Sequence, residues 1–354
     1  MRRILVTGAG GNAARNFIAS LRMAAEPFYI VGTDTNTFHL ACTDTDASYV
    51  VPRCDEEGYE DALLAIIALE RISLVHPQPD PEVAWLSEHR DRFPGLLFLP
   101  DHADVVACQD KMHANRLLAA GNVPVPRSIR AHAHMDFQET VNTLMGKSGK
   151  VWVRAIRGAG SRAALPVTNG EQAFSWIRYW AANRLMSTSD FMLCQFLPGR
   201  EFAFQSLWYD GELVTSMARE RTEYLMGNLM PSGQSSSPSV ARTVHRDDVN
   251  EVASAAVRAV SPRPHGVYCV DLKEDDKGTP CVTEINTGRF FTTSNFLAAA
   301  GSNMPYYYVR LAFGDRVAGV EPYNACEPDL YWVRGVDHKP HLFKGAPWIQ
   351  RRAA

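Results

Sequence analysis

Residues 280–291 read PCVTEINTGRFF, a strand-like run that carries an acid and an amide two positions apart. Side chains alternate between the two faces of a strand, so Glu284 and Asn286 are expected side by side on one face. Two oxygen ligands on a mostly buried sheet are costly unless a cation compensates them. An edge hairpin with its polar face in water is the alternative that these residues alone leave open.

The preceding run supplies a third oxygen ligand. Residues 265–280 read HGVYCVDLKEDDKGTP, in which an apolar run ends in Asp271 and a turn-prone Asp-Asp-Lys-Gly follows. A hairpin centred between residues 277 and 278 places Asp271 opposite Glu284, so both converge with Asn286. Mg²⁺ in proteins binds one or two carboxylates together with phosphate oxygens and water. The hairpin therefore predicts a magnesium and nucleotide site.

Length and composition restrict the class of protein. A chain of 354 residues is long enough for two or three packed units. Its net charge of -3 and its 21% of charged residues give no basic stripe, so no nucleic acid is expected as a partner. Seven scattered cysteines without a CxxC pair favour a cytoplasmic protein over a disulfide framework. The sequence has no membrane-length apolar run and no signal-peptide pattern, so no membrane partner is expected.

The first hundred residues alternate strands with helices. Apolar strand-like runs occupy residues 3–8, 28–34, 47–52, 73–77 and 95–100. Phe17, Ile18 and Leu21 have helical spacing after the first strand, as do the apolar residues of 61–72. This alternation predicts a parallel α/β domain.

The turn after the first strand has a glycine pattern of its own. Residues 8–13 read GAGGNA and Asp34 closes the second strand, which matches the dinucleotide-binding pattern of an NAD(P)-dependent oxidoreductase. A glycine turn that simply packs the first helix close to the sheet is the alternative.

Beyond residue 110 the chain carries two further motifs of a nucleotide site. In residues 151–164, VWVRAIRGAGSRAA, Arg154 ends a strand and precedes a glycine-rich loop whose amides can cover phosphates. In residues 194–202, CQFLPGREF, the strand end can pair with an adenine edge and Glu201 can accept ribose hydroxyls. Each motif alone is equally compatible with a surface hairpin or turn. Residues 227–239, rich in Gly, Ser and Pro, predict a mobile loop.

The order of these motifs is more specific than any one of them. The chain reads, in order, DKMHANRLLAAGNVPVP (110–126), VWVRAIRGAGS (151–161), QFLPGREF (195–202), MARERTEY (217–224), GVYCVD (266–271) and TEINTGR (283–289). This succession resembles the ATP-grasp superfamily, and most closely its branch similar to the carbamoyl-phosphate synthetase large subunit. The resemblance covers residues 3–315.

The resemblance implies an α/β and α+β fold, in which an N-terminal Rossmann-like parallel α/β domain precedes an ATP-grasp fold of two α+β subdomains that grip ATP. The expected boundaries are 1–105 for the Rossmann-like domain, 106–195 for the small central subdomain, 196–315 for the C-terminal subdomain with the metal site, and 316–354 for a tail packing on the core.

The resemblance also implies roles for individual residues. Nucleotide contacts are implied for Lys111 and Arg154 on the α- and β-phosphates, for Gly158, Gly160 and Ser161 over the phosphates, for Gln195, Phe196 and Leu197 along adenine, and for Glu201 on the ribose. Metal ligation is implied for Asp271, Glu284 and Asn286, and neutralisation of the γ-phosphate or acyl phosphate for Arg289. The usual order in the family is Asn, any residue, Arg, whereas this chain inserts a glycine to give Asn286-Thr287-Gly288-Arg289.

The implied activity is that of an ATP-dependent carboxylate–amine ligase, an ADP-forming C–N ligase that works through an acyl phosphate. ATP and Mg²⁺ are the expected cofactors, with Mn²⁺ as a substitute. Arg219 and Arg221 share one face of a strand, where they would bind the substrate carboxylate or the acyl phosphate; a solvated face is the alternative. Small carboxylates and amines, amino acids among them, are the expected substrates, with Asp80, Glu82 and Ser294 as lining candidates, and a homodimer is expected.

Three other activities stay open at this point. An ATP-grasp phosphotransferase without ligation would share every nucleotide residue named above. An NAD(P)-dependent Rossmann oxidoreductase would use the first glycine turn and Asp34. A non-catalytic nucleotide-sensing module would bind MgATP without releasing phosphate.

Overall fold

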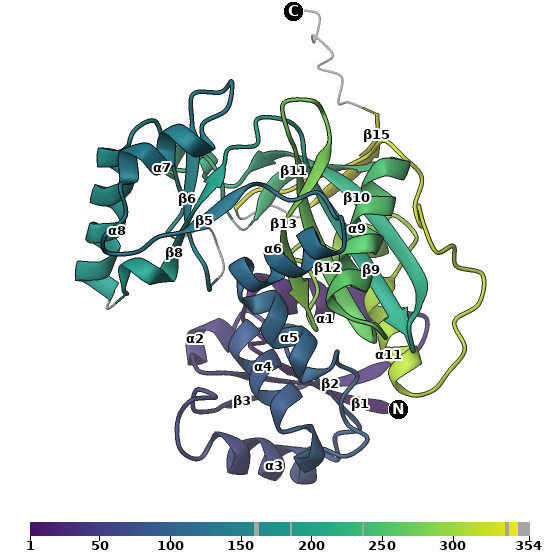
Figure 1. Ribbon diagram of the computed structural model, residues 1–354. Coiled ribbons are helices and arrows are strands. Elements are labelled where there is room, and N and C mark those ends of the chain that lie inside the picture. Colours follow the sequence, from purple (N-terminus) through teal and green to yellow (C-terminus); the bar gives the residue numbers. More distant parts are fainter. Residues whose placement is uncertain (159–162, 185, 236, 337–339, 346–354) are drawn as a thin grey trace, which may run out of the picture.

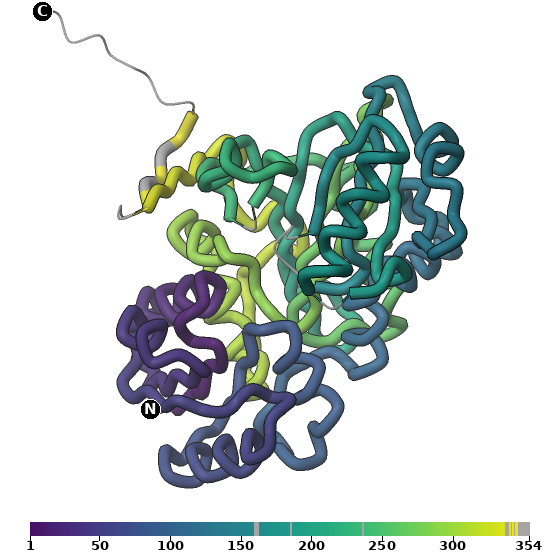
Figure 2. Tube along the Cα trace, turned by 90° about the vertical axis from the view of Figure 1, so that its left-hand side faces the viewer, coloured from purple at the N-terminus to yellow at the C-terminus, as the bar shows by residue number. Residues whose placement is uncertain are grey.

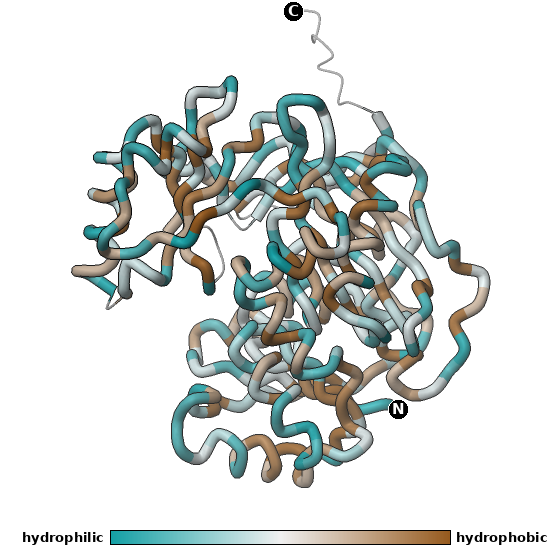
Figure 3. The backbone as a smooth tube through the Cα atoms, in the orientation of Figure 1, coloured by the Kyte–Doolittle hydropathy of each residue, from teal (hydrophilic) through white to brown (hydrophobic). Residues whose placement is uncertain are grey.

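The computed structural model describes residues 1–158, 163–184, 186–235, 237–336 and 340–345. These residues form three β-sheets with helices packed against them (Figure 1). Apolar residues concentrate along the strands and inner helix faces, whereas the connecting loops are mostly hydrophilic (Figure 3). Among the described residues, no helix combines the length and the apolar character that crossing a membrane requires.

The first sheet is parallel and has the strand order β3-β2-β1-β4. Its strands are β1 (Arg2–Thr7), β2 (Phe28–Asp34), β3 (Ala47–Val50) and β4 (Leu74–His76), and its helices are α1 (Asn12–Arg22), α2 (Thr37–Leu40), α3 (Tyr59–Glu70), α4 (Asp80–Glu88) and the 3₁₀ turn η1 (Arg90–Arg92). The predicted parallel α/β arrangement is confirmed. The strand expected at residues 95–100 is wrong, because only Leu97 forms a bridge there, and the prolines at 94 and 100 lack the N–H groups to extend it.

The second sheet is antiparallel, with the order β5-β8-β6-β7. This part of the chain contains α5 (His102–Gln109), α6 (Lys111–Ala120), β5 (Ser128–Arg130), α7 (Phe137–Leu144), β6 (Val151–Ala155), β7 (Leu165–Val167), α8 (Gly170–Arg184), η2 (Thr188–Asp190) and β8 (Phe191–Gln195). Helices α7 and α8 cover one face, on which Val151, Val153 and Leu193 are buried. The alternate residues, Trp152 and Arg154 among them, are left for the opposite face.

The third sheet has seven antiparallel strands in the order β13-β12-β9-β10-β11-β14-β15. Its elements are β9 (Glu201–Tyr209), β10 (Glu212–Tyr224), η3 (Gly227–Leu229), β11 (Pro238–Val244), α9 (Asp247–Val260), β12 (Gly266–Glu274), β13 (Pro280–Thr287), β14 (Leu330–Val333) and β15 (His341–Lys344). A turn at Asp210-Gly211 joins β9 to β10, with left-handed φ values of 53° and 93°. Helix α9 covers one face.

Two short helices follow the third sheet's β13. The structure has α10 (Ser294–Ala299) and α11 (Met304–Ala312). Between them Gly301 takes a left-handed φ of 105°, and Asn303 caps the second helix by accepting from the Tyr306 amide. The break turns the chain back towards the first sheet.

The first and third sheets share a hydrophobic core. Strands β1 and β2 are apolar on both faces because both faces are covered, with Leu5 and Val31 packing near α3. On the other face Ile4 and Ile30 join a cluster that also contains Tyr308 of α11. Helix α1 packs against α10 and α11, so the N-terminal sheet lies beside the end of the third sheet (Figure 2).

Candidate functional site

A cavity of about 1010 Å³ is bordered by residues of the second and third sheets and by turns and helix starts of the N-terminal part, and it holds almost every residue implicated by the sequence. The sequence-implicated residues that line it are Lys111, Arg154, Gly158, Gln195, Phe196, Leu197, Glu201, Arg221, Asp271, Glu284, Asn286 and Arg289. Arg219 is buried beside it, at 1% exposure. Gly160 and Ser161 lie outside the described residues. Of the lining candidates, Asp80 borders the cavity, whereas Glu82 and Ser294 do not.

The three oxygen ligands converge, but a β-bulge rather than the turn brings them together. Close to the turn the register is symmetric about residue 277, with Glu274 opposite Pro280. The register then shifts by one residue, so Thr283 is extra and Asp271 faces Glu284. Without that shift Glu284 would turn to the apolar face covered by α9. Asn286 Nδ2 donates to Asp271 Oδ2 at 3.3 Å.

Two cations from separate elements hold Glu284. Lys111 begins α6, and its Nζ lies 3.3 Å from Glu284 Oε1 while donating to the Gly158 carbonyl at 2.8 Å. Arg154, at the end of β6, donates to Glu284 Oε2 at 2.9 Å. Burial alone would raise the pKa of Glu284, but Lys111, Arg154 and Arg289 outweigh it and lower the pKa to about 2. Glu284 therefore stays ionised throughout the physiological range.

This lowered pKa predicts a specific acid dependence of stability. Because the pKa of Glu284 falls from 4.5 to about 2 on folding, its ion pairs stabilise the fold fully above about pH 4.5 and lose that effect towards pH 2. We expect the difference in unfolding free energy between the natural chain and Glu284→Gln to be constant above pH 5 and to shrink below about pH 4. Urea unfolding at a series of pH values measures it. A difference that does not change with pH would contradict the assignment.

Arg221 joins the metal-ligand candidates to Glu201. Its guanidinium donates to Asp271 at 2.5 Å and to Glu201 at 3.2 Å. Glu201 also accepts hydrogen bonds from Tyr224 and, at 2.7 Å, from Gln234 Nε2. The carboxylate implied for the ribose is thus held in a buried network.

Two residues that the sequence patterns did not single out, Lys273 and Gln234, both contact the carboxylate of Glu201. Lys273 Nζ lies 3.4 Å from Glu201 Oε2 and borders the cavity. The period of two along the strand already places Lys273 on the face of Asp271, so this residue was recoverable from the sequence. Gln234 belongs to the loop expected over residues 227–239, and no pattern in that loop distinguishes it.

Arg289 links the third sheet to the N-terminal part. Its guanidinium donates to both carboxylate oxygens of Asp80 and to the Asn286 side-chain oxygen. The inserted Gly288 has a left-handed φ of 72°, and a Cβ there would lie 2.7 Å from Val83 Cγ1. Glycine is therefore required at this turn because α4 packs directly against it.

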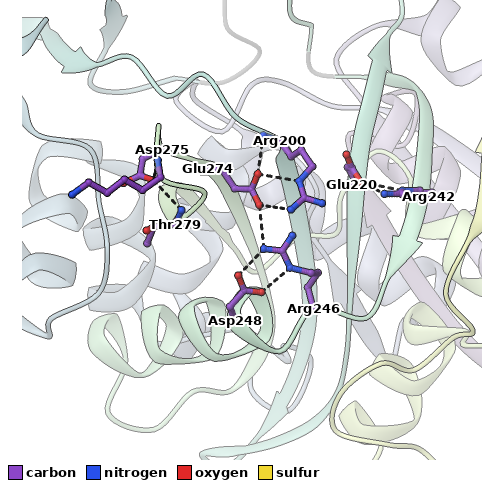
Figure 4. Close-up of polar contacts among 9 residues, drawn as sticks. Arg200, Glu220, Arg242, Arg246, Asp248, Glu274, Asp275 and Thr279 are labelled. Atoms are coloured by element: carbon purple, nitrogen blue, oxygen red, sulfur yellow. Dashed lines mark hydrogen bonds and ion pairs between the residues drawn. The ribbon is translucent and has the colours of Figure 1, made fainter. Parts of the chain in front are cut away.

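The segment expected along adenine ends β8. The backbone N–H of Gln195 donates to the Arg127 carbonyl, and the ring of Phe196 has the ammonium groups of Lys150 and Lys273 within 6.0 Å of its centroid. Immediately after it, Arg200 is held by Glu274, which also binds Arg246 (Figure 4). The loop that follows Leu197 is thereby fixed to the end of β12.

The glycine turn after β1 borders the cavity at Gly8 and Gly11, but other residues of the chain pack closely against it. Asp34 accepts hydrogen bonds from the backbone N–H groups of Gly10 and Asn36, so its carboxylate is used within the loop. A Cβ at Gly8 would lie 2.4 Å from Pro79, and one at Gly10 would lie 2.3 Å from His39. These contacts favour the packing interpretation of the turn over the oxidoreductase.

Comparisons with known proteins agree with this architecture. Residues 4–96 match the family described as PylC-like, N-terminal domain. No curated protein matches the sequence. Among solved structures, the L-amino acid ligase from Bacillus licheniformis is 13% identical with a TM-score of 0.69, covering 94% of this chain and 79% of that chain.

Two further structures are equally similar. Biotin carboxylase from Campylobacter jejuni is 13% identical with a TM-score of 0.71, covering 94% of this chain and 74% of that chain. N5-carboxyaminoimidazole synthetase from Staphylococcus aureus, complexed with ADP, is 13% identical with a TM-score of 0.70, covering 94% and 82%. At such low identity the likeness concerns the fold, and it confirms the fold class expected from the sequence.

Proposed function

We propose that this chain, which has the ATP-grasp fold, is an ATP-dependent carboxylate–amine ligase that works through an acyl phosphate and releases ADP and phosphate. The observation that carries the proposal is the cluster of Asp271, Glu284 and Asn286 beside Lys111 and Arg154 in one large cavity. Oxygen ligands and phosphate-binding cations meet there in the combination that a magnesium nucleotide requires.

The residues present fit Mg²⁺. Among the described residues no group of three His, Cys, Asp or Glu side chains is placed to hold a metal ion, so the Asn286 amide oxygen would complete the set with Asp271 and Glu284. Hard oxygen ligands of this kind suit Mg²⁺, and also Mn²⁺. When bound, the ion would neutralise charge on the β- and γ-phosphate oxygens. Lys111 and Arg154 would exchange their contacts with Glu284 for contacts with phosphate.

The cavity walls suit a nucleotide and an activated acid. Gln195, Phe196 and Leu197 would lie along adenine, Glu201 on the ribose, and Gly158, Gly160 and Ser161 over the phosphates. Arg221 and Arg289 border the metal ligands, where two guanidinium groups would stabilise an acyl phosphate during its formation and its capture by an amine.

The loop of residues 227–239 would shield the acyl phosphate from water. Gln234 and Ser235 border the cavity, and Gln234 is hydrogen-bonded to Glu201 across the strands. An acyl phosphate hydrolyses if water reaches it, so a loop fastened over the site favours transfer to the amine.

The experiment combines binding with chemical trapping. We expect MgATP, and not NAD(P), to raise the melting temperature, and we expect a pool of amino acids and small carboxylates to stimulate ADP release. Hydroxylamine should then convert the acid into its hydroxamate, which mass spectrometry identifies. ADP release without hydroxamate would favour the phosphotransferase, and MgATP binding without phosphate release under any acid would favour a sensing module.

The remaining expectations are part of the same proposal. The domain boundaries at 1–105, 106–195, 196–315 and 316–354, the homodimer and the cytoplasmic location are kept as stated above. Strands β14 and β15 of the last segment extend the third sheet, which supports a tail that packs on the core.

A further inference from the structure

Two arginines next to the cavity, the buried Arg219 and the half-buried Arg334, form no ion pair with an acid among the described residues. Arg219 is 1% exposed, and its Nε and Nη1 have no hydrogen-bond partner there. Within the described part of the chain, Arg334, which follows β14, donates only to neutral oxygens, namely the carbonyls of Pro238 and Thr292 and the Thr292 hydroxyl. Neither guanidinium forms an ion pair within the described residues.

Such an arrangement is costly for the protein alone. A charge that is buried loses its hydration. Without an ion-pair partner, nothing compensates the free energy of that loss. Burial and the neighbouring Arg221 lower the pKa of Arg219 to about 9, and burial lowers the pKa of Arg334 to about 10. The positive charge of Arg334 also lowers the pKa of Arg219, so the two groups act on one region.

Arg219 lies on the same face of the third sheet as the metal-ligand candidate Asp271. In the ladder of the third sheet Arg219 is paired with Ala203, and Ala203 with Asp271, so Arg219 and Asp271 share a row two strands apart. That separation is roughly 9.5 Å between backbones. The residue between them is Ala203, which is fully buried and whose side chain is too short to separate the two charged groups.

The turn that follows Arg289, with Phe291 and Thr292, lies between the two arginines and the cavity. The guanidinium of Arg219 lies 4.7 Å from the centroid of the Phe291 ring, and Arg334 binds both the carbonyl and the hydroxyl of Thr292. Phe291 and Thr292 both border the cavity. Arg219 and Arg334 do not border the cavity themselves, so a ligand group would have to pass this turn to reach them.

The reacting carboxylate cannot neutralise this pair. It must lie against the γ-phosphate, beside Asp271, Glu284 and Arg221, because the new bond joins its oxygen to that phosphorus. The row geometry leaves the Arg219 backbone roughly two strand spacings away. A second anionic group on the same molecule can reach the arginines while the first reacts.

We propose that Arg219 and Arg334 form a specificity site for a second anionic group, a carboxylate or a phosphate, on the acid substrate. The inference rests on the proposed function and narrows its substrate to dianionic acids. It also gives Arg334, which follows β14 and lies beyond the motifs singled out in the sequence, a place in the substrate site.

The test compares acids in matched pairs in the full-length chain. MgATP-dependent ADP release is measured with glutarate against pentanoate, succinate against butyrate, glutamate against glutamine, and O-phosphoserine against serine. Charge-assisted hydrogen bonds contribute about 1.5–3 kcal/mol, which corresponds to a preference of about 10- to 100-fold in kcat/KM for the dianionic member. A preference confined to O-phosphoserine identifies the group as phosphate, and one confined to the other pairs identifies it as carboxylate.

Variants of the two arginines test whether they cause the preference for dianionic acids. Arg334→Gln and Arg219→Lys are expected to raise KM for the preferred dianionic acid and to reduce its preference over the matched monoanion towards one. Arg242→Gln is the control, because Arg242 pairs with Glu220, whose side chain lies on the opposite face of β10 from Arg219 (Figure 4). It should leave the preference unchanged. Arg219→Lys keeps the charge, and Arg334→Gln provides an independent variant if Arg219→Lys does not fold.

The outcomes separate this inference from the proposed function. ADP release with monoanionic acids at the same kcat/KM as with dianionic ones overturns the inference and leaves the ligase intact. So does a preference that both arginine variants retain. No ADP release with any acid, and no binding of MgATP, overturns the proposed function and the inference with it.

Discussion

Replacing Glu284 by glutamine is expected to lower acid-stimulated, MgATP-dependent ADP release by about 100- to 1000-fold. Glu284 faces Asp271 across the hairpin and is the carboxylate that Lys111 and Arg154 both contact. Loss of one preorganised charge at a phosphoryl-transfer site typically has an effect of this size. The measurement is the initial rate of ADP release at saturating MgATP.

The control for this variant is Glu223→Gln. Glu223 is an exposed residue on β10 near the same cavity, and its replacement should leave the rate within a factor of about two. A melting curve with and without MgATP shows whether the Glu284 variant is folded and has lost nucleotide stabilisation. A folded Glu284→Gln variant with full ADP release would contradict the assignment of the metal and phosphate site.

Replacing Arg221 by methionine is expected to lower the free energy of unfolding by about 3–5 kcal/mol. The guanidinium, with 12% side-chain exposure, is the shared partner of Asp271 and Glu201. Removing it leaves two buried carboxylates without their main cation, and methionine keeps most of the packing volume. Urea unfolding at neutral pH measures the loss.

A double variant tests whether the loss comes from the unpaired acid. Arg221→Met combined with Asp271→Asn should recover a measurable part of the stability, because the carboxylate that lost its partner is then neutral. Arg53→Met is the surface control. Arg53 pairs with Asp55 where both side chains are 65% exposed, so its loss should cost less than about 1 kcal/mol. Equal losses for Arg221→Met and Arg53→Met would show that the buried network contributes nothing beyond a surface pair.

The sequence by itself determined the local elements and the chemical character of the site. Period-two alternation placed Glu284 and Asn286 on one face, and the strand, glycine turn and helix order predicted the first parallel sheet. The order of short motifs carried the resemblance from which the fold class was expected, and the solved structures confirm that fold class. Such signals are readable because strand alternation, turn residues and motif order are properties of neighbours along the chain.

Only the tertiary structure decided how these elements meet. The bulge at Thr283 sets which face Glu284 takes, the packing of Val83 explains Gly288, and Asp80 becomes the partner of Arg289. The same is true of Arg334, which reaches the region of Arg219 only because β14 adds to the far side of the third sheet. Contacts between residues far apart in the chain depend on sheet register and burial, and no local periodicity encodes either one.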